Sequence, residues 1–264
     1  VGLDICGVDV VAPSVDHPLE EQGGVMVEVN AAPGLRMHLD PSYGQGRAVG
    51  RAIINSMFAE GNDGRIPIAA VSGTNGKTTT VRLIAHMLKT KGHRVGMTCS
   101  DGIYIDNRRI DDGDCSGPKS ARGVLLNPVI DSAVFETARG GILREGLAFD
   151  TCDVAVVTNI GTGDHLGLSF ITTVQDLAVL KRVIVENVAP TGTAVLNADD
   201  PLVAPMADAC PGRVTFFGQD VGNPVISAHR AAGGRVVFLD GAEIVAAEGT
   251  LEQRMPLEAV PITR

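Results

Sequence analysis

The sequence has no closely spaced cysteines of the kind that form a disulfide framework or a zinc site. Its five cysteines, Cys6, Cys99, Cys115, Cys152 and Cys210, lie far apart, and their number is odd. Disulfide-rich and zinc-binding domains place their thiols in pairs, often with only two residues between them. Isolated thiols are typical of a reducing compartment, so we expect a cytoplasmic protein without disulfides.

Long apolar runs and an excess of positive charge are also missing. No stretch approaches the roughly 20 apolar residues that a membrane-spanning helix needs, and the first residues lack the layout of a signal peptide. The net charge of −9 at pH 7 disfavours a broad surface for nucleic acid or membranes. We expect neither as a partner. A nucleotide stays possible, because a phosphate site needs only local hydrogen-bond donors.

The chain starts at Val1 rather than at Met, already inside what resembles a folded element, and reaches Arg264 without an obvious finishing element. We therefore expect a piece of a longer protein. Its 264 residues suffice for one large domain or two smaller ones. Turn residues at 61–64 favour two domains, 1–62 and 63–264, with the second cut short at its C-terminal end.

The most informative stretch covers residues 68–81, with the sequence IAAVSGTNGKTTTV. A strand pattern stops at Ser72, a Gly-rich turn follows, and a helical pattern begins at Lys77. Such a turn points backbone N–H groups into one concavity that favours phosphate. Lys77 would reach the β- and γ-phosphates of ATP, and Thr78 would bind Mg²⁺. The general motif has glycine where this chain has Val71. We expect the phosphates to contact Gly73, Thr74, Asn75, Gly76, Lys77, Thr78 and Thr79.

Strands and helices alternate from Ile66 onward, which predicts an α/β fold with a mostly parallel sheet covered on both faces. The expected strands are 66–71, 94–99, 132–136, 153–158, 193–197 and 213–217. The expected helices are 77–91, 120–130, 172–188 and 200–208. Asp106-Asn107 predicts a hairpin turn. Three further short strands, 224–229, 235–239 and 244–247, are expected to form an antiparallel flap.

The first domain is expected to be a small α+β segment. Apolar pieces at 2–11 and 24–29 predict two antiparallel strands. A helix is expected from Asp40-Pro41, which resemble a cap and a first turn, to about Phe58.

Polar residues follow several of the predicted strands. Ligands of a parallel sheet gather beyond the carboxyl ends of its strands. Glu136, at the end of strand 132–136, is suited to hold Mg²⁺ that bridges nucleotide phosphates, although a helix cap or a surface acid is an alternative. His165, in the loop after strand 153–158, is either a second metal ligand or a solvated side chain.

Three more candidates carry weaker signals. Asn197 lies at the end of the expected strand 193–197 and would read an adenine edge. Asp200 is equally well explained as a cap before Pro201. Lys181 lies among apolar residues of the predicted helix 172–188, and the pattern alone favours a lysine at the rim of that helix.

In this order, these elements resemble the central ATPase domain of the Mur ligase family, whose phosphate loop lacks the first glycine. The resemblance implies that Glu136 and His165 hold Mg²⁺ and, with Lys77, serve catalysis. It also implies that Lys181, often carbamylated in that family, shares a second Mg²⁺.

The same resemblance assigns the nucleotide contacts outside the phosphate loop. Asn159, with the Asp164-His165 pair that follows it, matches the N…DH element of the family. Asn197 and Asp200 match its nucleotide-binding N-x-D-D-P element. The resemblance therefore implies ATP as the cofactor, bound together with Mg²⁺.

Residues 1–62 resemble a different family. The sequence VEVNAAPGL, preceded by Gly7-Val8-Asp9, is similar to the closing metal-binding segment of ATP-grasp ligases. Alternate residues of one strand share a face. The resemblance implies that Asp9, Glu28 and Asn30 bind Mg²⁺ there. The alternative is a surface hairpin without a metal.

An ATP-grasp end fused to a Mur-type domain resembles the cyanophycin synthetase family, as do the sequences at 136–147 and 114–122, ETARGGILREGL and DCSGPKSAR. This implies an ATP-dependent ligase that works through an acyl phosphate. In that family the ATP-grasp unit adds Asp to a polymer backbone, and the Mur-like unit adds Arg to the Asp side-chain carboxylate. The implied partners are Asp, Arg and a growing polymer primer, and we expect a homo-oligomer of the full-length enzyme.

Two other functions stay open at this point. One is a Mur-type ligase of different specificity, acting on folylpolyglutamate or a peptidoglycan precursor. The other is a nucleotide-binding module without catalysis. In every case we expect the 264-residue chain alone to be inactive as a ligase.

Overall fold

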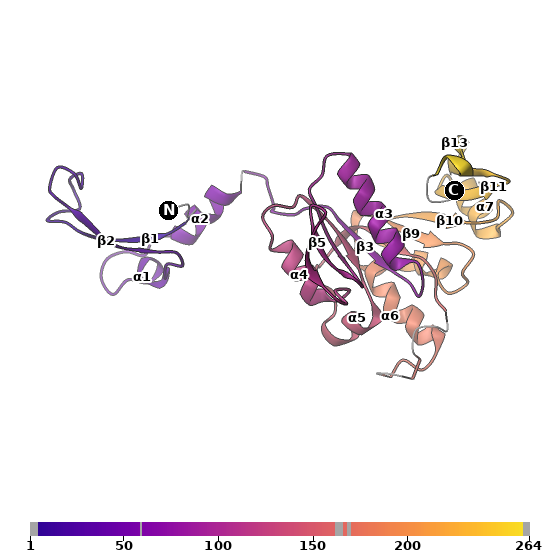
Figure 1. Ribbon diagram of the computed structural model, residues 1–264, viewed down its shortest axis with the longest axis horizontal. Helices are drawn as coiled ribbons and strands as arrows, with labels where there is room; N and C mark the ends of the chain where they lie inside the picture. The colour runs from indigo at the N-terminus through magenta and orange to yellow at the C-terminus, as the bar shows by residue number, and fades with distance from the viewer. Residues whose placement is uncertain (1–4, 59, 162–165, 168–169, 261–264) are drawn as a thin grey trace. The chain divides into compact units, whose positions relative to one another are not determined.

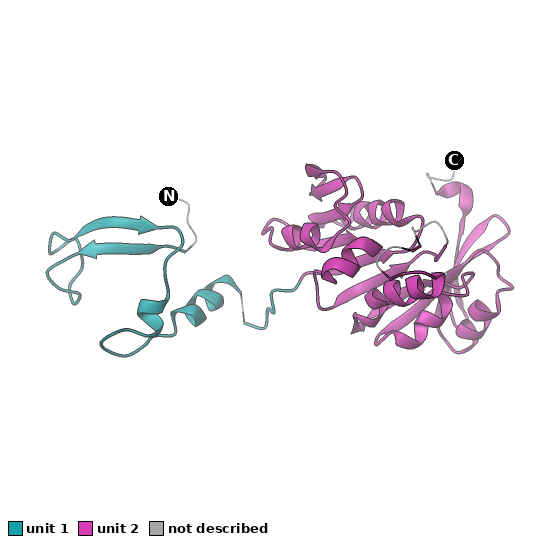
Figure 2. Ribbon diagram, turned by 90° about the horizontal axis from the view of Figure 1, so that it is seen from below, with its two compact units in different colours: residues 1–65 teal, residues 66–264 magenta. Residues whose placement is uncertain are grey.

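The computed structural model describes residues 5–58, 60–161, 166–167 and 170–260. The chain divides into two compact units, Val1–Arg65 and Ile66–Arg264 (Figure 2). Within the described residues, no helix combines the length and the apolar character needed to cross a membrane.

The first unit contains an antiparallel strand pair, as predicted, followed by helices. Its elements are β1 (Gly7–Val11), β2 (Val25–Asn30), α1 (Arg36–Leu39) and α2 (Val49–Met57). The predicted helical start at Asp40 is wrong, because Asp40 is the C-cap of α1 and the next helix begins only at Val49. Gly44 lies between them with a φ of +88°, a left-handed conformation that a right-handed helix does not contain.

The second unit is built on one large sheet (Figure 1). Its strands are β3 (Ile68–Ser72), β4 (Val95–Cys99), β5 (Gly102–Ile105), β6 (Arg108–Asp112), β7 (Ser132–Glu136), β8 (Cys152–Val157), β9 (Val188–Asn197), β10 (Arg213–Gly218), β11 (Arg235–Asp240), β12 (Glu243–Glu248) and β13 (Leu251–Pro256). Their order is β13-β12-β11-β10-β9-β8-β3-β7-β4-β5-β6. Neighbours are parallel from β11 to β4 and antiparallel at both edges. The predicted α/β class is confirmed.

Helices cover the two faces of this sheet. Along β3, Ala69 and Val71 pack in one core with Val81 of α3, whereas Ala70 packs in the opposite core. This alternation is the period of two that a strand imposes, and it explains why residues 68–71 of the strand are all apolar. The helices are α3 (Lys77–Thr90) on one face, and α4 (Pro118–Leu125), α5 (Arg139–Glu145) and α6 (Val174–Glu186) on the other.

Several predictions near the C-terminal end of the sheet need correction. Residues 224–229 form helix α7 (Pro224–Ala231) rather than a strand, because the Asn223 side chain accepts hydrogen bonds from Val225 N and Ile226 N and so caps a helix. The expected helix at 200–208 is the 3₁₀-helix η1 (Ala204–Ala209). The predicted flap pairs through β11 with β10 and so extends the main sheet, and its last strand, β13, was not predicted.

Candidate nucleotide and metal site

The carboxyl ends of five neighbouring parallel strands lie along the same side of the sheet. These strands are β9, β8, β3, β7 and β4. In the order of the sheet, their ends carry the chemistry-bearing residues. They are Asn197 at the end of β9, Thr158 and Asn159 after β8, the phosphate loop 73–76 after β3, Glu136 at the end of β7, and Ser100 after β4. Segments far apart in the sequence therefore meet at the edge where ligands of such sheets bind.

Backbone conformation requires glycine in the phosphate loop. Gly73 has a φ of +142°, and a Cβ atom there would lie 1.9 Å from the Thr158 Oγ1 atom. Gly76, the N-cap of α3, has a φ of +83°. Side chains at either position would strain the backbone, so the glycines of the predicted motif are explained by geometry.

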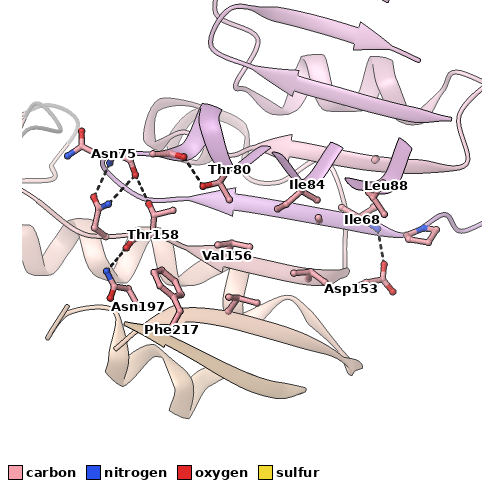
Figure 3. Close-up of a pocket in the computed structure, with 17 residues that line it drawn as sticks. Ile68, Asn75, Thr80, Ile84, Leu88, Asp153, Val156, Thr158, Asn197 and Phe217 are labelled. Atoms are coloured by element: carbon pink, nitrogen blue, oxygen red, sulfur yellow. Dashed lines mark hydrogen bonds between the residues drawn. The ribbon is translucent and has the colours of Figure 1, made fainter. Parts of the chain in front are cut away.

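The loop is held from the side by the segment that follows β8. The Asn159 side chain accepts a hydrogen bond from Asn75 N at 2.9 Å and donates one to Asn75 O at 3.1 Å. Thr158 Oγ1 donates to the same carbonyl oxygen at 2.6 Å (Figure 3). Thr74 N donates to Asn159 O at 2.8 Å. The backbone of Asn75 is thus held at both its N–H and its C=O.

A buried carboxylate and two hydroxyl groups meet at the start of α3. Thr78 Oγ1 donates to Glu136 Oε2 at 2.8 Å, and Ser100 N donates to the same oxygen at 3.1 Å. The two hydroxyl oxygens, Thr78 Oγ1 and Ser100 Oγ, lie 3.0 Å apart. Glu136 is only 4% exposed.

This group of oxygens fits Mg²⁺. Magnesium in nucleotide sites is held by one or two carboxylates together with hydroxyl groups, waters and substrate phosphates. The described residues contain no cluster of three His, Cys, Asp or Glu side chains. Ser100 was not predicted, although it follows β4 at the same edge of the sheet.

The segment that carries Ser100 is stabilised by charge. Cys99 Sγ donates to Asp101 Oδ1 at 2.7 Å, and Arg82 of α3 pairs with the same carboxylate. The bond from Cys99, followed by the charge of Arg82, lowers the pKa of Asp101 despite an opposing effect of desolvation. Burial and the Asp101 bond raise the pKa of Cys99 to about 11. The thiol therefore stays protonated at neutral pH and acts as a donor.

Two lysines reach the carbonyl groups of the phosphate loop. Lys77 Nζ donates to Thr74 O at 2.9 Å, and Lys181 Nζ, from α6, donates to Gly73 O. Lys181 is fully buried, so its interpretation as a rim lysine is wrong. A cation is buried only where polar groups compensate the loss of water, and Lys181 satisfies that condition beside the loop.

Asn197 and Asp200 make hydrogen bonds to the chain itself. Asn197 Nδ2 donates to Thr158 O at 2.8 Å, and its Oδ1 accepts from Asp199 N at 2.9 Å. Asp200 Oδ2 accepts from Ile160 N at 2.6 Å. Its other oxygen accepts from Leu202 N at 2.9 Å, but the predicted helix start at Pro201 is wrong, because residues 201–203 form a turn and the N-cap of η1 is Val203. The adenine contact of Asn197 stays a prediction.

A pocket of 740 Å³ adjoins the phosphate loop (Figure 3). Its polar end is formed by Asn75, Thr158, Asn159 and Asn197. Its apolar lining includes Val154, Val156, Val195 and Phe217 of the sheet, and Ile84 and Leu88 of α3. Apolar walls with a few fixed polar groups are typical of sites for small organic ligands.

The two remaining predicted metal sites stay predictions. His165, with its neighbour Asp164, lies outside the described residues. In the first unit, Asp9 pairs directly with Glu28 across the strands, and Asn30 lies two residues after Glu28. The three side chains therefore share one face of the hairpin. Magnesium binding by Asp9, Glu28 and Asn30 stays a prediction.

The family described as Mur ligase middle domain matches residues 71–256. The chain belongs to the Mur ligase family. It is 50% identical over 255 residues to the cyanophycin synthetase of Synechocystis sp., with 97% of this chain and 29% of that protein covered. The cyanophycin synthetase of Geminocystis herdmanii is 48% identical over 264 residues, with 100% and 30% covered. The resemblance to cyanophycin synthetases is confirmed, and the chain spans about 30% of their length.

Among solved structures, a UDP-N-acetylmuramoyl-L-alanyl-D-glutamate–2,6-diaminopimelate ligase matches with a TM-score of 0.56. The match covers 72% of this chain and 39% of that structure, at 20% identity. At this identity the likeness shows the fold alone. It agrees with the mostly parallel sheet of the second unit.

Proposed function

We propose that this chain supplies the ATP-binding part of an acid–amino-acid ligase that forms carbon–nitrogen bonds through an acyl phosphate. The observation that carries the proposal is the hydrogen-bonded cluster of Thr78, Glu136 and Ser100 at the start of α3. It lies beside a phosphate loop whose conformation requires glycine. That arrangement suits the binding of a nucleoside triphosphate together with Mg²⁺ rather than of a phosphate ion alone.

Each residue has a role in this proposal. Backbone N–H groups of the loop and the Lys77 ammonium bind the β- and γ-phosphates. Thr78, Glu136 and His165 hold Mg²⁺, which when bound neutralises charge on the transferring phosphoryl group. Lys181, in its carbamylated form, holds a second Mg²⁺. Asn159 fixes the loop from the side.

The reaction proposed for the Mur-type unit has two steps. The side-chain carboxylate of a terminal Asp attacks the γ-phosphate of ATP in line and releases ADP. The α-amine of Arg then attacks the resulting acyl phosphate, loses a proton and displaces inorganic phosphate. The product is an isopeptide bond. The identity of 50% with a cyanophycin synthetase supports Asp and Arg as the amino acids.

For the first unit we propose a part of the ATP-grasp ligase that extends the Asp backbone. The shared face of Asp9, Glu28 and Asn30 supports a Mg²⁺ site there. The full-length enzyme would thus contain two ATP sites, of which the phosphate loop described above serves the addition of Arg. We further propose that the full-length enzyme is a homo-oligomer.

The proposal is tested by ADP release from the full-length enzyme with Asp, Arg and a polymer primer, each omitted in turn. We expect ADP release that depends on the primer and has separate Asp-dependent and Arg-dependent parts. Release that requires a folate or a peptidoglycan precursor instead indicates a Mur-type ligase of other specificity. The absence of release under every condition indicates a nucleotide-binding module without catalysis.

A further inference from the structure

The support of the phosphate loop extends across three neighbouring strand ends. Strands β3, β8 and β9 lie side by side and parallel, and Ser72, Val157 and Leu196 occupy the same level of the sheet. The residues that follow these three therefore lie side by side at the carboxyl ends of the strands. They are Gly73, Thr158 and Asn197. Figure 3 shows Thr158 between Asn75 and Asn197.

Hydrogen bonds connect these three strand ends one after another. Asn197 Nδ2 donates to Thr158 O at 2.8 Å. Thr158 Oγ1 donates to Asn75 O of the phosphate loop at 2.6 Å. In parallel, Asp200 Oδ2 accepts from Ile160 N at 2.6 Å, which holds the same segment from its other end. The residues after β9 thus hold residues 158–160, and Thr158 in turn holds the loop.

Steric contact makes this support tight. The Thr158 hydroxyl occupies the space that a side chain at position 73 would need, since a Cβ atom there would lie 1.9 Å from Oγ1. The loop and Thr158 are therefore in direct contact, with a hydrogen bond to Asn75 O and a close approach to Gly73. A loop held in this way has its phosphate-facing conformation before any ligand arrives.

We propose that Thr158 and Asn197 are positioning residues that preset the phosphate loop. This inference rests on the proposed function. The first of them touches the loop, and the second acts through Thr158. Their effect on affinity comes from preorganisation, because a loop that is only partly in the binding conformation binds its ligand more weakly by that fraction. The factor is the same for every ligand that uses the loop, whether or not it carries a base.

The equal change in the affinities for all such ligands distinguishes a preset loop from direct recognition of adenine. A residue that reads the base changes the affinity for ATP and leaves the affinity for inorganic tripolyphosphate unchanged. A residue that presets the loop changes both by the same factor. Calorimetric titration of the chain with ATP and with tripolyphosphate, each in Mg²⁺, measures the two affinities.

We expect Thr158→Val and Asn197→Ala to lower both affinities about tenfold, the order of magnitude of one lost hydrogen bond. Thr158→Ser keeps the hydroxyl and is expected to bind like the unaltered chain. Ser132→Ala is the control, because the Ser132 hydroxyl is buried without a hydrogen-bond partner at the opposite end of β7. Thermal unfolding of each variant identifies any that fails to fold. If Thr158→Val fails to fold, Asn197→Ala carries the test.

Several outcomes would overturn the inference alone. They are an ATP-selective loss in Asn197→Ala, an unchanged affinity in Thr158→Val, and a Thr158→Ser variant as weak as Thr158→Val. Failure of the unaltered chain to bind tripolyphosphate while it binds ATP also contradicts a preset loop. If the unaltered chain binds neither ligand, the proposed function fails, and the inference fails with it.

Discussion

At the scale of single residues, the phosphate loop depends on the absence of a side chain at Gly73. We predict that Gly73→Ala abolishes nucleotide binding and lowers the thermal unfolding midpoint. The reason is a φ of +142° combined with a Cβ position 1.9 Å from Thr158 Oγ1. Titration calorimetry and thermal unfolding of the chain measure the two effects.

A glycine in open space provides the matched control for this substitution. Gly123 lies inside α4, and a Cβ atom there meets nothing within 4 Å. Alanine is favoured over glycine in a helix, so Gly123→Ala is expected to preserve binding and to stabilise the fold by up to about 1 kcal/mol. Normal nucleotide binding by Gly73→Ala would show that the described loop is not the phosphate site.

The sequence indicated some of the residues at this edge and not others. Glu136 and Asn197 were identified because charged or amide side chains at the very ends of apolar strands are unusual. Ser100 gave no such signal, since serine after a strand is common in turns. The burial of Lys181 was also hidden, because the helical pattern shows which side of α6 is apolar but not how deeply a lysine lies.

At the scale of elements, helix α6 carries Lys181 to the loop and begins with a capping box. Asp176 N donates to Thr173 Oγ1 at 3.1 Å, and Thr173 N donates to Asp176 Oδ2 at 2.9 Å. We predict that Thr173→Ala lowers the free energy of unfolding at pH 7 by about 1 kcal/mol, the usual cost of a lost cap. Urea unfolding of both proteins measures the difference.

The pH dependence of this effect follows from Asp176. Its bond with Thr173, followed by backbone N–H bonds, lowers the pKa of Asp176 below its ordinary value. A carboxyl whose pKa is lowered by folding stabilises the fold above its unfolded pKa, and this contribution is lost as pH falls through the folded pKa. The difference between Thr173→Ala and the unaltered chain should narrow in that acidic range. A difference that is constant down to acidic pH would argue against the capping box.

Element types were predictable where local signals agreed. The strands β3, β4, β7 and β8 were found close to their observed bounds, because apolar β-branched runs are bounded by glycine or polar residues. Residues 224–229 were mistaken for a strand, since the apolar content of a short run fits both types. The deciding feature was Asn223 before Pro224, a helix-start signal that outweighs the strand pattern.

At the scale of the whole molecule, the two compact units predict where the intact chain is first cut. Arg65 is the last residue of the first unit and follows the turn at Gly64, whose φ is +72°. We predict that limited trypsin digestion first cleaves after Arg65 and leaves residues 66–264 as a resistant core. Mass spectrometry of the early fragments identifies the cut. Early cuts within β3–β9 would contradict a compact second unit.

The order of the strands in the sheet could not be read from the sequence. The alternation of strands and helices predicted a parallel sheet, but it leaves many possible orders. The observed order places β8 beside β3 and β7 on its other side, which brings Asn159 and Glu136 to opposite flanks of the phosphate loop. The site therefore depends on long-range pairing, which local patterns do not encode.

The most direct test of the proposed ligase is Arg-dependent ADP release by the full-length enzyme carrying Lys77→Ala. Lys77 lies at the start of α3 and is proposed to bind the transferring phosphate. Lys89→Ala, in the last turn of the same helix, is the matched control. We predict that Lys77→Ala abolishes Arg-dependent ADP release and Arg incorporation, while Lys89→Ala leaves both unchanged. Normal Arg incorporation by Lys77→Ala would contradict the assignment of this loop as the ATP site for Arg addition.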